Sequence, residues 1–429
     1  MELTEFVSLL SKIDDAIEQQ SFEDALKLML ANFDRCPEAA LLRERVAIVA
    51  ASCGRKKEAV EVWDCVARHW ANAGYPTRSL AAIKQMQALR PDTTVLLDHF
   101  TALYNIKSPY LDQEARPPQV AAPTEPLELE VDASPVTRSE LLDRAFAMAS
   151  RSEGLVDKPG SLPALPLLSL LPSEALRRVL DYLEYEVFAD AEPVLSVGAP
   201  CEDLLWTVTS DFTIEDHDPT LRLPSGALLG LNSFGRSAST ARHEVFSQKN
   251  SELLRLTSQA VDALDAEFGD FRNRLATLRR HALTEGLLER HPMFAELSAE
   301  GRVELMRSFV GLRVESGEKL IVQNSESPGI FLVLDGQVDI VRAEEGWEIT
   351  IATLAAGDVF GEVGVVSDKS ALAGCVMTTP GHLLFLSRED FGQVADRHPS
   401  VAKYTVNLAN QRMQDVETTL SAQDLTEVD

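Results

Sequence analysis

The chain has 429 residues, of which 45% are hydrophobic and 25% are charged, a composition typical of folded proteins rather than of disordered ones. Since this length exceeds what one compact core holds, about two to four domains are expected. The formal net charge of −27 disfavours nucleic acids and anionic membranes as partners, because binding to phosphate groups needs clustered Lys and Arg.

Cysteine usage and the N-terminal sequence predict a cytoplasmic protein. The five cysteines form no Cys-x-x-Cys pair, so reduced thiols are favoured over disulfides or a metal site. They are Cys36, Cys53, Cys65, Cys201 and Cys375. Glu2 and Glu5 stand where a secretory signal carries positive charge. No run approaches the roughly 20 apolar residues that span a bilayer, so no membrane contact is expected.

Residues 1–107 are predicted to form consecutive amphipathic helices, because apolar residues recur there at helical spacing. Small residues and prolines recur at fixed intervals: Ala25 stands twelve positions before Pro37, and Ser79 stands twelve before Pro91. Small residues let paired helices approach closely, and a proline ends the second helix. The pattern resembles degenerate tetratricopeptide repeats, with an unrelated helical bundle as the alternative. That resemblance implies a concave face for a protein partner.

Residues 108–138 are predicted to form a semi-extended linker. Acidic residues accumulate there, helical periodicity is lost, and prolines recur at Pro109, Pro117, Pro118, Pro123, Pro126 and Pro135. A recognition segment for a polyproline-binding partner is the alternative interpretation. Ordered structure is expected to resume with a helix from about Ser139, whose side chain suits the N-cap position.

The remainder of the chain contains an internal duplication. Residues 171–214 align with 297–340 without a gap, at a shift of 126 positions, and apolar residues match apolar ones, as Trp206 matches Leu332. Two further matches follow, LPSGALLG at 223–230 with LAAGDVFG at 354–361, and LLRL at 253–256 with LLFL at 383–386. Matches of this length with so few shifts are hard to produce by chance, so two domains of one fold are expected.

Each copy has the layout of a small β-roll flanked by helices. A helix is followed by short strands of alternating polarity, interrupted at Gly198 and Gly226 in the first copy and at Gly336 and Gly357 in the second. In the second copy, Asp335-Gly336 is expected to be the turn of a hairpin.

The stretch FGEVGVVSDKSALAG, residues 360–374, resembles the phosphate-binding cassette of cyclic-nucleotide-binding domains. Members of that family that bind cAMP or cGMP usually read Phe-Gly-Glu, a few apolar residues and then Pro-Arg-Ala. Glu362 matches the Glu, but Ala371 stands in place of the Arg. The resemblance implies that Glu362 accepts a ribose 2′-hydroxyl, while no Arg neutralises a cyclic phosphate.

The resemblance defines a candidate ligand site in the second copy, made of Phe360, Gly361, Glu362, Val363, Lys369, Ser370 and Ala371. In the family, backbone N–H groups of a short helix and an Arg hold the phosphate. Losing one partner of a buried charge pair costs about 2–5 kcal/mol, so weak or no binding of cAMP and cGMP is expected. Lys369 is the only local cation, with a solvated surface charge as its alternative role. Glu362 alternatively stabilises a helix N-terminus without contacting a ligand.

The first copy departs further from the family pattern. Gly230 matches the glycine, but Leu231 replaces the Glu and Thr240 replaces the Arg. Arg242 follows two positions late, where a surface contact is favoured over a ligand contact. Leu229, Leu231 and Phe234 are expected to fill or flank the pocket of a structural module.

The predicted fold class is α+β and multidomain: an N-terminal helical, tetratricopeptide-like array and then two β-roll, cyclic-nucleotide-binding-like domains with flanking helices. The expected boundaries are the helical domain at 1–107, the linker at 108–138, the first β-roll domain at 139–283, the second at 284–416 and an acidic tail at 417–429.

No catalytic constellation or metal-spaced cluster appears in the sequence, and His281 and His291 stand apart from any nucleophile motif. The chain is therefore expected to be a non-enzymatic regulatory or scaffold protein that requires no cofactor and binds a protein partner through the helical repeats or the C-terminal helices. The alternative is a small-molecule sensor that binds a nucleoside or a cyclic nucleotide in the second domain. A DNA-binding regulator is disfavoured, because only a short acidic segment follows Arg412.

Overall fold

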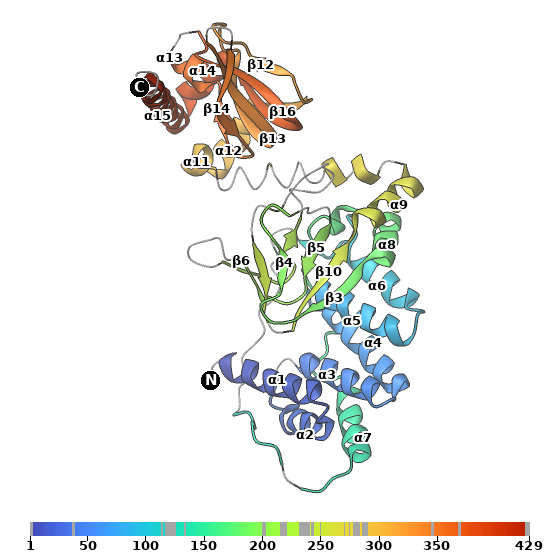
Figure 1. Cartoon of the computed structure of the whole chain (residues 1–429). Coiled ribbons are helices and arrows are strands. Elements are labelled where there is room, and N and C mark those ends of the chain that lie inside the picture. Colours follow the sequence, from blue (N-terminus) through green and yellow to red (C-terminus); the bar gives the residue numbers. More distant parts are fainter. Residues whose placement is uncertain are drawn as a thin grey trace. The chain divides into compact units, whose positions relative to one another are not determined.

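The computed structural model describes residues 3–36, 39–112, 115, 126–132, 134–199, 203–214, 221–230, 241, 244–248, 250–269, 271–273, 275–277, 284, 291–344, 347–367 and 370–424. The chain divides into two compact units, Met1–Ala276 and Thr277–Asp429, whose elements are labelled in Figure 1. Among the described helices, none combines the length with the apolar composition needed to cross a membrane.

The first unit begins with the helices α1 (Leu3–Glu18), α2 (Phe22–Asn32), α3 (Ala39–Ser52), α4 (Lys56–Asn72), α5 (Pro76–Leu89) and α6 (Thr94–Tyr104). Neighbours along the chain pack together, α1 with α2, α3 with α4 and α4 with α5. Gly54 and Gly74 turn the chain between helices at φ +82° and +86°, which glycine adopts without steric penalty. The Ser79 hydroxyl donates to the Ala67 carbonyl at 2.8 Å, which keeps α5 close to α4. The likeness to tetratricopeptide repeats stays a prediction.

Helices α1–α6 form what we call the helical layer. Helix α7 (Arg138–Ala149) belongs to it as well, because it packs on α2 and α3 (Figure 1). Its N-cap is Thr137, so the prediction of Ser139 was wrong. The Thr137 hydroxyl accepts from the Glu140 N–H, and the Glu140 carboxylate accepts from the Thr137 N–H at 3.2 Å. This reciprocal capping box starts the helix two residues earlier than Ser139 would, because it satisfies two backbone N–H groups at once.

The larger sheets of this unit form what we call the N-terminal β-roll. In the chain, this roll lies between α8 (Ser173–Tyr182) and α9 (Ser258–Phe268). Its strands are β3 (Glu184–Phe188), β4 (Pro193–Leu195), β5 (Leu204–Thr207), β6 (Phe212–Ile214), β7 (Leu221–Leu223), β8 (Leu228–Leu229), β9 (Val245–Ser247) and β10 (Ser251–Leu256). They form two sheets, in the orders β3-β10-β5-β8 and β4-β9-β6-β7. Helix α5 contacts β3 and β10, and α6 contacts α8, so the helical layer and this roll are one body.

Three short elements lie in the chain between α6 and α8. β1 (Leu111–Asp112) pairs in parallel with β2 (Leu162–Pro163), and a 3-10 helix, η1 (Leu168–Leu170), precedes α8.

The second unit contains the C-terminal β-roll. Its strands are β11 (Val310–Val314), β12 (Lys319–Ile321), β13 (Gly329–Glu344), β14 (Trp347–Leu354), β15 (Val359–Phe360) and β16 (Gly374–Ser387). Its helices are α11 (Pro292–Ala295), α12 (Ala299–Ser308), α13 (Glu362–Ser367), α14 (Arg388–Arg397) and α15 (Pro399–Asp424). The sheet order is β11-β16-β13-β14, with β12 on β16 and β15 on β13. One core, which includes Phe331, Phe360 and Met377, fills the roll, and another, with Phe294 and Val401, packs the helices onto it.

The strand pairings of the two rolls correspond residue by residue. Opposite pairs that match are Leu204–Leu256 with Ile330–Leu386, Leu205–Leu229 with Phe331–Phe360, and Phe212–Leu223 with Val338–Leu354. These are the positions that the sequence alignment places together, so the sequence repeat is also a repeat of strand register.

The hairpin turn expected at Asp335-Gly336 was wrong, because β13 runs through it as one strand. The register against β16 shifts on either side of Gly336, between Val333 and Val338. Gly336 has φ +100°, and a Cβ there would meet the Met377 side chain and the Gly381 backbone. Glycine therefore forms a bulge that bends a long strand around the roll.

Candidate functional site

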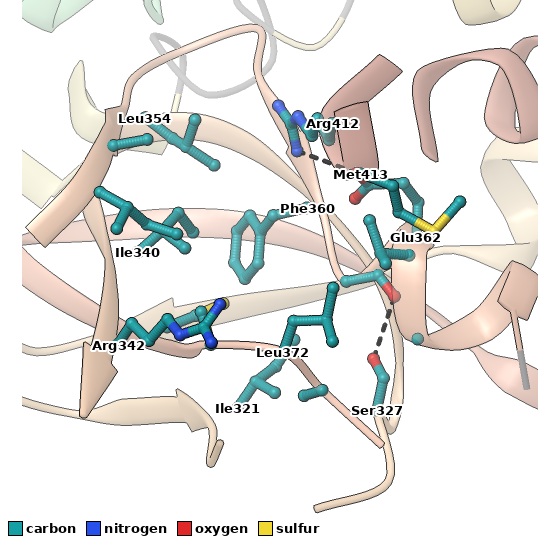
Figure 2. A pocket seen from close by; sticks show the side chains of 18 residues that line it. Ile321, Ser327, Ile340, Arg342, Leu354, Phe360, Glu362, Leu372, Arg412 and Met413 are labelled. Atoms are coloured by element: carbon teal, nitrogen blue, oxygen red, sulfur yellow. Dashed lines mark hydrogen bonds and ion pairs between the residues drawn. The ribbon is translucent and has the colours of Figure 1, made fainter. Parts of the chain in front are cut away.

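A cavity of about 250 Å³ lies within the C-terminal β-roll, beside α13 (Figure 2). Its walls are mainly apolar and include Ile321, Ile340, Ile351, Leu354, Phe360 and Leu372. Among the residues that the structure describes, the charged side chains lining it are Arg342, Glu362 and Arg412. The cavity thus combines apolar walls with a few polar groups, which is the usual character of small-molecule sites.

Gly361 positions the start of α13 at the cavity. Its φ is +85°, and a Cβ at this residue would overlap the Gly329 carbonyl oxygen at the start of β13. The buried Ser327 hydroxyl lies 3.1 Å from the Gly361 carbonyl oxygen and 3.0 Å from that of Gly329, as donor to either. The close approach of two backbone segments therefore requires glycine at position 361.

Glu362, the first residue of α13, is 1% exposed. Its Oε1 accepts from Arg412 Nη1 at 3.1 Å, and its Oε2 is buried with no hydrogen-bond partner among the described residues. Burial raises the pKa of Glu362, and the Arg412 guanidinium opposes that shift. Glu362 thus brings to the cavity wall a carboxylate with one acceptor oxygen that no described residue satisfies.

Arg412 lies on α15 and is the principal site residue that sequence reasoning missed. Besides Glu362, it donates to the Val359 carbonyl on β15, and Figure 2 shows it with Met413 at the side of the cavity where Glu362 lies. The available signal was its place on the helix: it continues the stripe of Val401, Thr405 and Ala409, which are all fully buried. An arginine on a buried helical stripe indicates a charge partner inside the domain.

Ala371 lines the cavity with a methyl group where the family carries a cation. It is 8% exposed, and its backbone N–H donates to the Ser325 carbonyl at 2.7 Å while its carbonyl accepts from the Asn324 N–H at 2.8 Å. The cassette segment is thus held in place, but without the phosphate partner. Ser370, beside it, is exposed, and Lys369 lies outside the described residues.

Leu372 and Met377, two apolar side chains close to the cassette, leave the cavity open. Leu372 lines the wall and is 44% exposed, whereas Met377 is fully buried in the core and lies outside the lining. Val363 also lines the cavity. Of the predicted set, Phe360, Gly361, Glu362, Val363 and Ala371 are brought together around one cavity.

Arg342, on β13, is a second lining residue that the sequence analysis did not single out. In Figure 2 it lies across the cavity from Glu362. It pairs with Ile349 on β14, so it reaches the cavity from strands that lie outside the cassette. Among the described lining residues, two arginines and one glutamate give a net positive charge.

Other candidate groups have structural roles or lie outside the described residues. Burial raises the pKa of the Cys375 thiol in the cavity wall to about 12, so this thiol stays protonated. The His291 ring lies 2.9 Å from the Gly357 carbonyl oxygen and caps α11. In the N-terminal roll, Gly230 follows β8 at φ +80°, as Gly361 follows β15. The predicted residues Leu231, Phe234, Thr240 and Arg242 lie outside the described part of the chain.

Residues 312–398 match the family model of the cyclic nucleotide-binding domain. A cAMP-dependent protein kinase regulatory subunit of Mycosarcoma maydis is 30% identical over 95 residues, which are 22% of this chain and 18% of that protein. A cyclic AMP receptor protein of Thermus thermophilus is 30% identical over 128 residues, 29% of this chain and 59% of the relative. The solved catabolite activator protein of Thermus thermophilus is 27% identical, covers 31% of this chain and 63% of that one, and has a TM-score of 0.29.

The chain therefore carries a cyclic nucleotide-binding domain near its C-terminus. It spans less than two thirds of the length of these relatives, 18% of the kinase subunit and 59% of the receptor protein.

Proposed function

We propose that this chain is a cytoplasmic, non-enzymatic regulatory protein whose C-terminal domain senses a ribose-bearing small molecule of the nucleoside class and binds cAMP or cGMP weakly. The observation that carries the proposal is the Glu362 carboxylate, which lines an open cavity with one buried oxygen that has no hydrogen-bond partner among the described residues.

The Glu362 oxygen favours a ligand that carries a hydroxyl donor. A buried acceptor without a partner costs about 1–3 kcal/mol, and a ligand hydroxyl that donates to it recovers this free energy. Phe360, Ile340 and Leu372 supply apolar walls for a flat base. The cavity of about 250 Å³ is slightly smaller than the roughly 300 Å³ at which drug-sized ligand sites begin, so it suits a small ligand. A ribose with a base fits this combination.

The Ala371 methyl group disfavours a cyclic phosphate at the cassette. Losing the charge partner of a buried phosphate costs about 2–5 kcal/mol, which is roughly 30- to 4,000-fold in affinity. A nucleoside carries no phosphate and loses nothing at this position. The domain is therefore expected to bind nucleosides at least as tightly as their cyclic phosphates.

Thermal melting of the purified chain with adenosine, guanosine, cAMP or cGMP tests the proposal. A nucleoside is expected to raise the melting temperature, and Glu362→Ala is expected to abolish that shift. Glu318→Gln changes an exposed carboxylate of the same domain and is expected to keep it. If none of the four compounds shifts the melting of the unaltered chain, the proposed function is wrong.

A second candidate is a cyclic nucleotide whose charge partner is Arg342 instead of a cassette residue. The net positive lining and the place of Arg342 across the cavity from Glu362 favour it (Figure 2). Under this alternative, Arg342→Gln lowers cAMP affinity at least tenfold and leaves adenosine affinity unchanged. Under the nucleoside proposal, the variant changes the two affinities to the same extent.

We further propose that α15 transmits the occupancy of the cavity to a protein partner. Arg412 and Met413 line the cavity from α15, and the helix continues beyond them to Asp424. A ligand that donates to the second Glu362 oxygen changes the surroundings of the Glu362–Arg412 pair, which holds this part of α15 to the roll. The N-terminal β-roll, which repeats the same strand register, is proposed to be a second domain of the same fold with a structural role.

A further inference from the structure

The α1–α2 surface of the helical layer holds an extended segment of the chain's own linker. This linker segment comprises residues 126–132 and Ser134, and it belongs to no helix or strand. Exposure alternates from Leu127 to Glu130, with Leu127 and Leu129 half-buried and Glu128 and Glu130 exposed, whereas Val131 and Asp132 are both exposed. An alternation of this period is that of an extended peptide lying on a surface.

Asn32, at the end of α2, holds the backbone of the linker segment. It is fully buried, its Nδ2 donates to the Glu128 carbonyl at 2.8 Å, and its Oδ1 accepts from the Glu128 N–H at 2.8 Å. The same Nδ2 donates to the Leu28 carbonyl within α2 at 2.8 Å, which fixes the orientation of the amide. Two hydrogen bonds to both backbone groups of one residue reproduce the pairing of a β-strand, so Asn32 recognises extended backbone.

Three cations extend this recognition along the segment. Their carbonyl acceptors are Leu129 for Lys12 at 3.3 Å, Asp132 and Ser134 for Lys27 at 2.6 and 3.0 Å, and Pro126 for Arg35 at 3.4 Å. Arg35 also donates to the Glu128 carboxylate at 2.6 Å. We call Lys12, Lys27, Asn32 and Arg35 the backbone clamp. In a chain with a net charge of −27, three gathered cations select an acidic ligand.

The elements on both sides of the linker segment are held by contacts of their own. On one side, β1 is anchored by β2 through Leu111–Leu162 and Asp112–Pro163. On the other side, α7 is held by its own capping box and by packing on α2 and α3. Most clamp contacts are to backbone carbonyls, so another extended acidic sequence satisfies them equally well.

From this geometry we propose that the backbone clamp is a docking site for an extended acidic segment of a partner protein, in which apolar residues alternate with acids. The linker segment occupies the site in cis, and the partner binds by displacing it. An unoccupied clamp would leave the buried Asn32 amide without its two backbone partners, which is the property of a surface built to be covered.

The test uses the full chain and a labelled peptide, PLELEVDAS, with the sequence of residues 126–134. In an open variant, residues 126–134 are replaced by a Gly/Ser sequence of equal length. The open variant is expected to bind the peptide at least tenfold more tightly than the unaltered chain, because a tethered occupant competes at an effective concentration of about millimolar. Fluorescence anisotropy measures both affinities.

Two controls separate backbone recognition from charge attraction. A peptide that is N-methylated at the residue equivalent to Glu128 keeps its charge but lacks the N–H that donates a hydrogen bond to Asn32 Oδ1. It is expected to bind at least tenfold more weakly. Lys27→Glu, a change at the protein surface, is expected to weaken the unmodified peptide to a similar extent. Equal binding of the methylated and unmodified peptides would overturn the proposal, as would a folded open variant that binds neither.

Hydrogen exchange on the unaltered chain keeps the proposal testable if the open variant does not fold. Excess PLELEVDAS peptide is expected to accelerate exchange of the Glu128 amide while leaving the amides of α7 protected. If the Glu128 amide exchanges only together with the whole helical layer and the peptide has no effect, the segment is a permanent structural strap and the proposal fails.

Discussion

Glu362 and Arg412 form a charge pair between α13 and α15, 50 positions apart in the chain. Glu362 is 1% exposed and Arg412 27%, so the carboxylate is desolvated while the guanidinium keeps contact with water. Such a pair stabilises the domain mainly by preventing an isolated buried charge. Both residues also line the cavity, so we expect the occupancy of the site to affect the stability of α15.

Replacing Arg412 by Met is expected to destabilise the second unit by about 1–3 kcal/mol, because it leaves the Glu362 carboxylate buried without its cation. The double variant Glu362→Met with Arg412→Met is expected to lose less than the sum of the two single variants. A double-mutant cycle by urea unfolding measures this coupling. Additive losses would show that the two residues do not interact.

Glu44, on α3, predicts a pH dependence of the first unit. Its carboxylate accepts from the Trp70 indole N–H at 2.6 Å, and burial raises its pKa from 4.5 to about 7. Between these values the folded state binds more protons than the unfolded state, so the free energy of unfolding falls as the pH rises through this window. In Glu44→Gln, the fall in the free energy of unfolding across this pH window is expected to be smaller by on the order of 1–3 kcal/mol.

Urea unfolding at pH 5 and pH 7.5 checks this slope, with Glu61→Gln, an exposed change on α4, as the control that keeps it. An unchanged slope in Glu44→Gln would remove Glu44 as its source.

At the scale of elements, the site depends on where α13 begins. β15 ends at Phe360, whose ring stacks on Phe331 of β13 at 4.8 Å, and Gly361 then turns the chain at φ +85°. The turn delivers Glu362 to the first position of α13, inside the roll. The conformation of Gly361 therefore determines both where α13 starts and where the cavity-lining carboxylate lies.

Gly361→Ala is expected to destabilise the second unit by about 2 kcal/mol or more, because an alanine at positive φ is strained by about 1–2 kcal/mol and its Cβ overlaps the Gly329 carbonyl. Gly392→Ala in α14 is the matched control: its Cβ enters open space, and it is expected to stabilise by about 0.5–1 kcal/mol. Chemical unfolding of both variants measures the difference. Equal effects would contradict the role given to Gly361.

Sequence reasoning reached the elements that local patterns determine. The aligned repeats placed Leu204 and Ile330 at equivalent positions, and the strand register agrees. Sequence reasoning failed at Gly336, because a glycine between two apolar runs is compatible with a hairpin turn and with a bulge. The structure has the bulge. Sequence reasoning also missed Arg412 and the Asn32 contacts, because partners 50 and 96 positions apart leave no mark in a local motif.

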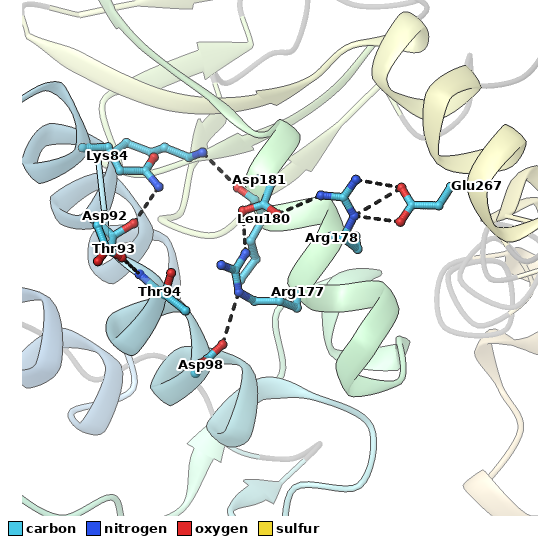
Figure 3. Close-up of polar contacts among 11 residues, drawn as sticks. Lys84, Asp92, Thr93, Thr94, Asp98, Arg177, Arg178, Leu180, Asp181 and Glu267 are labelled. Carbon is cyan, nitrogen blue, oxygen red and sulfur yellow. Dashed lines mark hydrogen bonds and ion pairs between the residues drawn. The ribbon is translucent and has the colours of Figure 1, made fainter. Parts of the chain in front are cut away.

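At the scale of the molecule, the helical layer and the N-terminal β-roll form one unit. Lys84 of α5 donates to the Leu180 carbonyl of α8 at 2.9 Å, and Arg177 of α8 pairs with Asp98 of α6 at 3.3 Å (Figure 3). Burial lowers the pKa of Lys84 to about 8, because the ammonium group that donates to the Leu180 carbonyl is shielded from water. A partner that docks on the helical layer would therefore bind a body that includes a β-roll.

Lys84→Met is expected to lower protection from hydrogen exchange in α4 and β10 alike, by about 1–2 kcal/mol, because it leaves the Leu180 carbonyl without its donor. Exchange measured under mild urea reports both elements in one experiment. Loss of protection in the helices alone would show that the layer and the roll unfold separately.

The central claim is that the C-terminal domain recognises a ribose without the phosphate. Isothermal titration calorimetry of the full chain and of Ala371→Arg, with adenosine, guanosine and cAMP, tests it most directly. The unaltered chain is expected to bind a nucleoside at least as tightly as cAMP, and Ala371→Arg is expected to gain roughly 30-fold or more for cAMP with nucleoside affinity unchanged. Binding of cAMP by the unaltered chain in the low micromolar range or tighter, and more tightly than either nucleoside, would contradict the account.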